Sequence, residues 1–175
     1  MIRETTQVGN PCIRAKASPA PVPSAKSRKI VTDLTDSMRH TDLVGMAAPQ
    51  IGSSVRIFVT EVRRTKVRKP IDLDSLRVFI NPEIIHVSKK HALDWEGCGS
   101  VAFSGLFGKV RRPVSVTVRA QDIDGAYFEL RASGLLARII QHEIDHLNGI
   151  LFVDHCSPKT FMSANEYRKM RNPKN

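Results

Sequence analysis

The chain has 175 residues, and its 27 Lys and Arg against 17 Asp and Glu give a formal net charge of +10. This length fits one domain, and 41% hydrophobic with 25% charged residues is close to globular averages, which excludes a disordered chain. No apolar run approaches the ~20 residues of a membrane helix, so we expect no membrane partner. The first residues lack the apolar segment of a secretory signal, and three scattered cysteines favour a reducing compartment, which we expect to be the cytoplasm.

The first half of the chain predicts one helix followed by strands. A Pro-, Ala- and Ser-rich stretch at residues 18–27 is typical of a loop. Apolar residues then recur at helical spacing and predict an amphipathic helix over residues 25–39. Three apolar, β-branched segments predict strands, of which Asn81-Pro82 separates the last two: residues 55–61, 76–80 and 83–87.

The second half predicts a hairpin and two helices. Alternating valines at 114, 116 and 118 predict a half-buried strand, which Asp124-Gly125 connects to a strand at 127–131. Ser133 offers a helix N-cap, and residues 135–148 have helical periodicity until Gly149. Ser157-Pro158 predicts the start of a last, short helix reaching about residue 170.

The order of these elements predicts the fold class. Strands in the middle and helices at the ends favour an α+β fold rather than a regular βαβ repeat. We expect a single domain in which antiparallel or mixed sheets pack around the central helix of residues 135–148, with an N-terminal helix and a short C-terminal helix.

The sequence His142-Glu143-Ile144-Asp145-His146 indicates a metal site. Residues four apart lie on the same face of a helix, so both imidazoles can bind one cation. Glu143 is placed to act as a general base toward a water at that cation.

Two imidazoles need a third ligand, and the sequence leaves two candidates. The position six residues after His146 is Phe152, which excludes the metzincin pattern. Glu166 lies downstream at a spacing that zinc peptidases use. Cys98 lies between Gly97 and Gly99, which let the backbone approach a ligand closely. A Cys/His/His site with one open position is a catalytic arrangement, so both candidates stay open at this point.

A segment rich in small residues, 44–52, contains Gln50. Its side-chain amide can donate a hydrogen bond to an oxyanion. A tight packing turn would have the same composition.

Together and in this order, three segments resemble the motifs of the peptide deformylase family. The family patterns are Gly-Φ-Gly-Φ-Ala-Ala-x-Gln, Glu-Gly-Cys-Φ-Ser and His-Glu-Φ-Asp-His, where Φ is apolar. The matching segments here are residues 43–50, 96–100 and 142–146. The resemblance covers about residues 8–160, and it implies a catalytic domain at 1–160 followed by a basic helix or tail at 161–175.

The resemblance implies a metal-dependent hydrolase that removes the N-terminal formyl group from formyl-methionine of new polypeptides and releases formate. It implies these roles: metal ligands Cys98, His142 and His146; catalytic groups Glu143, the Gln50 amide and the Gly99 N–H; and substrate-binding residues Val44, Gly45, Gly97 and Ile139. One divalent cation per chain is expected. A thiolate with two imidazoles suits Zn²⁺, Ni²⁺, Co²⁺ or iron, and the resemblance implies Fe²⁺ as the physiological ion.

Three positions depart from the family patterns. Leu43 replaces the first glycine, Gly99 replaces a larger and often apolar residue, and Ala102 replaces a frequent proline. These changes put the shape of the substrate pocket in question. A deformylase-like protein with altered substrate or reduced activity is therefore one alternative, and a metallopeptidase using Glu166 is another.

Partners follow from the same resemblance and from the charge. We expect nascent formylated polypeptides as substrates and weak association with the ribosome. The basic stretches at 63–69 and 168–174 raise a non-catalytic, RNA-binding alternative, but an aromatic fraction of 6% and the lack of a nucleic-acid motif argue against a specific nucleic-acid partner. An organelle matrix, after removal of a presequence, is the alternative to the cytoplasm.

Overall fold

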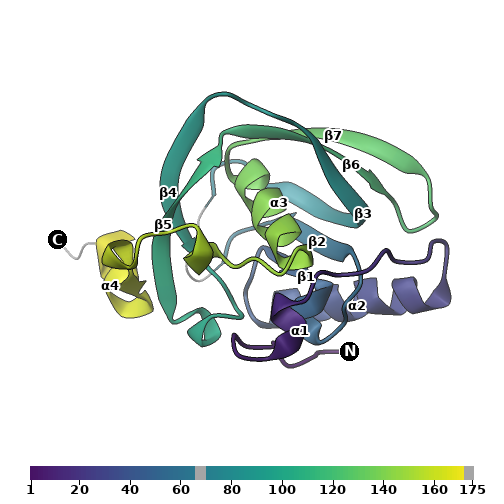
Figure 1. The fold of residues 1–175 in the computed structure, drawn as a ribbon, viewed down its shortest axis with the longest axis horizontal. Coiled ribbons are helices and arrows are strands. Elements are labelled where there is room, and N and C mark those ends of the chain that lie inside the picture. The colour runs from purple at the N-terminus through teal and green to yellow at the C-terminus, as the bar shows by residue number, and fades with distance from the viewer. Residues whose placement is uncertain (66–69, 172–175) are drawn as a thin grey trace.

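A computed structural model describes residues 1–65 and 70–171. It contains two antiparallel sheets and a central helix (Figure 1). The helices and strands are α1 (Pro11–Arg14), α2 (Ala25–His40), β1 (Gly45–Ala47), β2 (Ile57–Val62), β3 (Asp74–Val87), β4 (His91–Gly97), β5 (Leu106–Pro113), β6 (Ser115–Gln121), β7 (Tyr127–Ser133), α3 (Gly134–Leu147), β8 (Met162–Ser163) and α4 (Ala164–Arg171). Short 3₁₀ turns lie at Ala48–Ile51, Ala102–Ser104, Phe152–Asp154 and Pro158–Thr160.

The strands form a five-stranded sheet in the order β1-β2-β3-β6-β7 and a three-stranded sheet in the order β4-β5-β8. In Figure 1, α3 lies between the two sheets and α2 lies beyond the β1 end of the larger one. This arrangement confirms the predicted α+β fold with sheets around the central helix. Among the described residues, no helix is long and apolar enough to span a membrane.

The main core lies between the larger sheet and α3. Phe58 of β2 pairs in register with Phe79 of β3, and their rings stack with centroids 4.5 Å apart. Ile140 and Leu147 of α3 belong to the same buried cluster as these two rings, and both side chains are fully buried. Burying one such side chain stabilises the fold by about 1.5–3 kcal/mol, so α3 is held firmly under the sheet.

The last helix covers the smaller sheet. Tyr167 of α4 stacks on Phe107 of β5 with centroids 4.0 Å apart, and it meets the edge of Trp95 of β4 at 6.0 Å. A Cβ at Gly97 would lie 2.7 Å from the Phe107 ring, so glycine is needed where the ring crosses β4. These aromatic contacts hold the end of β4, which leads directly into Cys98.

Two local predictions were wrong. Asn81-Pro82 does not separate two strands, because β3 runs through it with a shift in register between Ile80 and Glu83. Asn81 has φ +51, and its side chain hydrogen-bonds both the N–H and the C=O of Ala20. This local irregularity lets the strand continue through Pro82, which has no N–H to donate. Ser157-Pro158 begins only a 3₁₀ turn, and the last helix starts later, at Ala164.

The sequence also did not predict β4 and β5. Gly97 and Gly108 interrupt the apolar alternation at their paired ends, and both are close-packing positions. A Cβ at Gly108 would lie 2.8 Å from the Cys156 sulfur. The predicted basic stretches at 63–69 and 168–174 lie partly outside the described residues.

Candidate metal centre and its cavity

Helix α3 brings two imidazoles to one face. His142 and His146 are one turn apart, and their ring centroids are 4.9 Å apart. Ser133 occupies the N-cap position with extended backbone but makes no side-chain capping bond within the described residues. Gly149 ends the helical segment with φ +74, and a Cβ there would lie 2.2 Å from the Arg14 carbonyl oxygen. Only glycine fits this position, which fixes where the helix stops.

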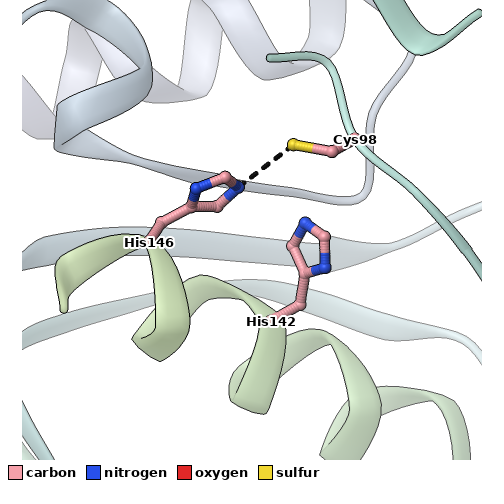
Figure 2. A group of neighbouring side chains, drawn as sticks. All are labelled: Cys98, His142 and His146. Carbon is pink, nitrogen blue, oxygen red and sulfur yellow. Dashed lines mark hydrogen bonds between the residues drawn. The ribbon is translucent and has the colours of Figure 1, made fainter. Parts of the chain in front are cut away.

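Cys98 approaches the two imidazoles from the end of β4. Its Sγ atom lies 3.1 Å from Nε2 of His146 (Figure 2). One ligand atom from each of Cys98, His142 and His146 lies within 4.8 Å of the others. A thiolate with two imidazoles is a donor set that zinc, iron, cobalt and nickel accept, so these residues fit a divalent cation.

The two imidazoles differ in their electrostatic surroundings. Burial lowers the pKa of His142, but hydrogen bonds to Cys98 and Glu96 raise it well above 6.5. Burial and the neighbouring His142 lower the pKa of His146 well below 6.5, which keeps that ring neutral. A neutral imidazole is the form that binds a cation, and the lowered pKa favours that form of His146.

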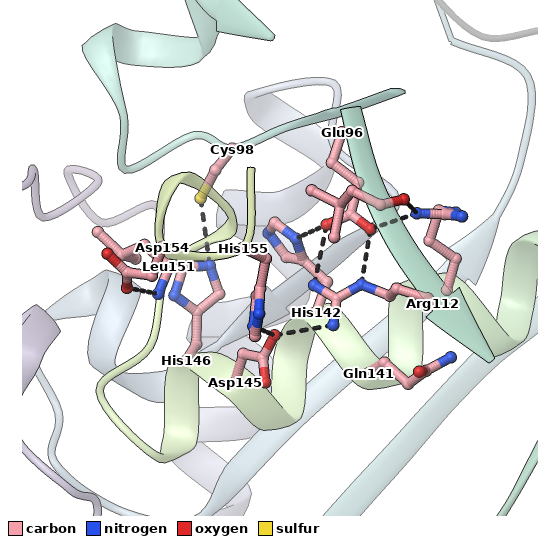
Figure 3. Close-up of polar contacts among 12 residues, drawn as sticks. Glu96, Cys98, Arg112, Gln141, His142, Asp145, His146, Leu151, Asp154 and His155 are labelled. Atoms are coloured by element: carbon pink, nitrogen blue, oxygen red, sulfur yellow. Dashed lines mark hydrogen bonds and ion pairs between the residues drawn. The ribbon is translucent and has the colours of Figure 1, made fainter. Parts of the chain in front are cut away.

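Glu96 connects the cluster to buried arginines. Its side chain accepts from Nδ1 of His142 at 3.0 Å and from Arg112 at 2.6 and 3.0 Å (Figure 3). Arg138 adds a third partner at 2.7 Å. Burial raises the pKa of Glu96, but His142 and Arg112 outweigh this and hold the pKa far below 4.5. The carboxylate therefore stays charged and orients the His142 ring.

The network continues to the other acid of the histidine motif. Asp145 accepts from Arg112 at 2.8 Å and contacts Nε2 of His155 at 3.0 Å. The fold therefore brings Glu96, Arg112, Asp145 and Arg138 into one chain of ion pairs.

Glu143 lies beside the cluster in an apolar position. It is 3% exposed, and its Oε2 atom has no hydrogen-bond partner among the described residues. Burial raises its pKa to about 7. A Cβ at Gly45 would lie 2.5 Å from its Oε1 atom and 2.7 Å from Ile139. Glycine at 45 therefore makes room for the carboxylate.

The Gln50 amide has a fixed orientation. Its Oε1 atom accepts from the Ala47 N–H at 2.8 Å. This leaves Nε2 to donate toward Ser100 Oγ at 3.3 Å and Cys98 Sγ at 3.6 Å. The amide donor therefore faces the cysteine rather than solvent.

These groups line a cavity of about 700 Å³. All four residues predicted to bind substrate lie on its wall, namely Val44, Gly45, Gly97 and Ile139. Gln50, Cys98, Gly99, His142 and Glu143 also line it, and His146 lies behind them, fully buried. Further lining residues were not predicted as site residues: Thr5, Phe103, Phe107, Leu135, Arg138 and Arg168.

An unusual turn forms part of the cavity rim. Ala102, Phe103 and Ser104 have φ values of +49, +49 and +62. Proline is locked near φ −65°, so the alanine at 102 fits this backbone where proline would not. Phe103 is 71% exposed at the rim, and its N–H donates to Gln7 Oε1 at 3.1 Å.

Glu166, the rival third ligand, does not belong to this group of possible ligands. It is exposed on α4 and pairs with Lys169 at 2.7 Å. Within residues 1–65 and 70–171, the His and Cys group that could hold a metal consists of Cys98, His142 and His146. The metallopeptidase alternative is therefore not favoured.

Comparison with known proteins gives a consistent result. The family model described as "Polypeptide deformylase" matches residues 2–162. A protein of Dictyoglomus thermophilum named "Peptide deformylase" is 40% identical over 160 residues, which cover 91% of this chain and 96% of that protein. One of Thermomicrobium roseum with the same name is 40% identical, covering 91% and 88%.

Solved structures agree with these sequence matches. A class I type b peptide deformylase of Acinetobacter baumannii bound to Met-Ala-Ser has a TM-score of 0.84 and 31% identity. The alignment covers 89% of this chain and 98% of that one. The peptide deformylase of Thermotoga maritima has a TM-score of 0.80 and 33% identity, covering 90% and 99%.

Proposed function

The chain belongs to the polypeptide deformylase family of metal-dependent hydrolases, and from that premise we propose how its own residues remove the formyl group from formyl-methionine. Cys98, His142 and His146 would hold one divalent cation. When bound, this cation supplies a Lewis acid that polarises the formyl carbonyl and acidifies an attacking water. The observation that carries the proposal is the convergence of a thiol and two imidazoles beside the buried carboxylate of Glu143.

Glu143 would transfer protons as the general base and then as the general acid. Its carboxylate accepts a proton from the attacking water, whose oxygen adds to the formyl carbon. The same carboxyl group then returns the proton to the leaving amine as the C–N bond breaks, which gives formate and a free N-terminus. A pKa raised to about 7 supports this role, because a base and acid works best when its pKa is near the working pH.

Two hydrogen-bond donors would stabilise the oxyanion. Gln50 would donate from Nε2, and its fixed Oε1 contact with Ala47 means that little reorganisation is needed during the reaction. The Gly99 N–H would be the second donor. Glu96 acts as a positioning residue that holds the His142 ring.

The substrate is proposed to be a formylated nascent polypeptide. The A. baumannii relative binds Met-Ala-Ser, a peptide that begins with methionine. A cavity of about 700 Å³, with Val44, Gly45, Gly97 and Ile139 on its wall, has room for a methionine side chain and the residues after it. Residues 1–160 would carry this activity, and the basic segment 161–175 would support weak association with the ribosome.

Ferrous iron is proposed as the ion in the cell, with Zn²⁺, Ni²⁺ or Co²⁺ in purified protein. The donor set accepts all of these, and an oxidisable thiolate ligand fits an oxygen-sensitive site. Metal analysis after anaerobic and aerobic purification tests this choice. Equal iron content and equal activity in both preparations would argue against iron. The cytoplasm is proposed as the compartment, which cell fractionation followed by immunoblotting would test.

The central experiment measures formate released from formyl-Met-Ala-Ser by iron-loaded protein, beside Glu143→Gln. We expect turnover by the wild type and a loss of about 10²–10⁴-fold in the variant. Metal content of Cys98→Ser and Glu166→Gln is measured in parallel, and only the former should lose metal. No formate from the metal-loaded wild type would favour a family member with another substrate.

A further inference from the structure

The end of the Leu43 side chain lies beside Gly99 in the lining of the cavity. A Cβ built at Gly99 would lie 2.9 Å from Cδ1 of Leu43, closer than real Cβ atoms approach a neighbour, and 3.5 Å from Cγ2 of Thr5. The φ of Gly99 lies outside the left-handed region, so its backbone would accept another residue. A side chain at 99 would therefore have to displace the end of the Leu43 side chain, which occupies the adjacent space.

The backbone holds Leu43 in this place. Its N–H donates to the Met38 carbonyl at 2.9 Å, and its own carbonyl accepts from Arg63 at 3.0 Å. Asp42, which precedes it, has φ +60, so the chain turns sharply as it enters β1. The side chain is half-buried and packs against the cluster that contains Leu34 and Met38. Only its outer end is free to move.

The position of this contact relates it to the substrate. Leu43 is two residues from Gly45, which touches Glu143, and Gly99 follows the ligand Cys98 directly. Both segments line the cavity, and the end of the Leu43 side chain lies beside Gly99. A peptide whose formyl group reaches the Cys98 cluster would occupy this same cavity, which Leu43 and Gly99 also line.

We propose that Leu43 is a specificity-determining residue that contacts the peptide immediately after its formyl-methionine. Its side chain supplies the apolar wall that a larger residue at 99 would otherwise supply, and it limits the size of the second residue of the substrate. The proposal rests on the deformylase activity proposed above. The Leu43 side chain can move more easily than the backbone at Gly99, because Cδ1 of Leu43 is the far end of a flexible side chain.

This flexibility gives a sharp test. Gly99→Ala does not need to unfold the protein, because the Leu43 end can move aside. It should therefore change specificity only when Leu43 is present. In a Leu43→Ala background the added methyl group meets no close contact, because its remaining neighbour, Cγ2 of Thr5, lies at an ordinary van der Waals distance of 3.5 Å. A role of Leu43 in core packing alone would lower the melting temperature without linking the two positions in this way.

The experiment measures kcat/KM for formyl-Met-Ala-Ser and formyl-Met-Trp-Ser with the wild type, Leu43→Ala, Gly99→Ala and the double variant. We expect the wild type to prefer the alanine peptide and Leu43→Ala to reduce that preference about tenfold, as one lost apolar contact in a pocket does. Gly99→Ala should change the preference about fivefold alone and less than about twofold in the Leu43→Ala background. Melting temperature and metal content are measured for every variant.

The matched control is Leu130→Ala, a half-buried leucine on β7 that does not line this cavity. It should lower the melting temperature and leave the substrate preference unchanged. An equal effect of Gly99→Ala in both backgrounds, or an unchanged preference in Leu43→Ala, would overturn the proposal. If Leu43→Ala does not fold, Leu43→Val and Leu43→Met take its place. Formate release by the wild type from either peptide keeps this result separate from failure of the proposed function.

Discussion

The Nδ1 atom of His142 lies 3.0 Å from Oε2 of Glu96, a carboxylate that two buried arginines also hold. This contact places the other ring nitrogen toward Cys98 and makes Glu96 the support for one ligand. We predict that Glu96→Gln weakens metal binding about 10–100-fold, because the neutral amide holds the imidazole less firmly. Titration of metal-free protein with Zn²⁺ in a competing chelator measures this affinity.

The matched control for that variant is Glu129→Gln. Glu129 also pairs with an arginine, Arg119, at 2.9 Å, but on an exposed face of the larger sheet. Its replacement should leave the affinity unchanged, since exposed ion pairs contribute only about 0–1 kcal/mol. Equal affinities of the Glu96 variant and the wild type would show that the ligand needs no support from this carboxylate.

Removal of the metal should lower the thermal stability. A ligand present at about 100 times its dissociation constant stabilises the folded state by about 2.7 kcal/mol, which for a domain of this size is about 5–10 °C in Tm. We expect EDTA dialysis to lower Tm by this amount and Zn²⁺ to restore it. Cys98→Ser should show neither change, whereas Cys12→Ser, a half-buried thiol outside the cluster, should show both. Calorimetry with and without the cation makes the comparison.

Glu143→Gln should separate chemistry from metal binding. The substitution keeps the shape of the side chain but removes the group that accepts the proton. The expected result is a kcat lowered by about 10²–10⁴-fold with an unchanged metal content. Elemental analysis and formate assays on the same preparation give both quantities. A kcat within tenfold of the wild type would assign the proton transfer to another group.

Glu61 gives a pH-dependent contribution to stability. Its two hydrogen bonds from Arg39, at 2.7 and 2.9 Å, hold its pKa below the usual 4.5 despite partial burial, and they connect β2 to α2. A depressed pKa in the folded state stabilises the protein above pH 4.5, and this contribution is lost as the pH falls through the folded value. Glu61→Gln should therefore lower Tm by about 1–3 °C at pH 7 and by less at pH 3. A Tm difference that does not shrink on acidification would contradict this.

The sequence predicted what depends on local spacing. His142 and His146 are one helical turn apart, so their pairing follows from periodicity alone. Cys98 is distant along the chain, and the residues alone left both Cys98 and Glu166 open as the third ligand until the resemblance was considered. Strands β4 and β5 were missed because glycines stand where their close contacts leave no room for a side chain, and such contacts are visible only in three dimensions.

Contacts between residues distant in sequence also determine the shape of the pocket, so this shape was not predicted. Leu43 and Gly99 each look like a departure from a pattern when considered separately. In the folded chain, the Leu43 side chain occupies the space next to Gly99 that a larger residue at 99 would fill. The two departures from the family pattern therefore compensate each other. The left-handed turn at 102–104 was likewise outside the reach of sequence reasoning, because several successive residues with positive φ are rare outside glycine.

The aromatic contacts between α4 and β4 have a practical consequence for spectroscopy. Trp95 is the single tryptophan of the chain, and it lies next to Glu96 and against Tyr167 and the ammonium of Lys109. Its fluorescence therefore comes from one indole on the strand that carries the thiol to the cluster. Emission intensity and quenching of the unlabelled protein can follow events at that strand in real time, without an introduced dye.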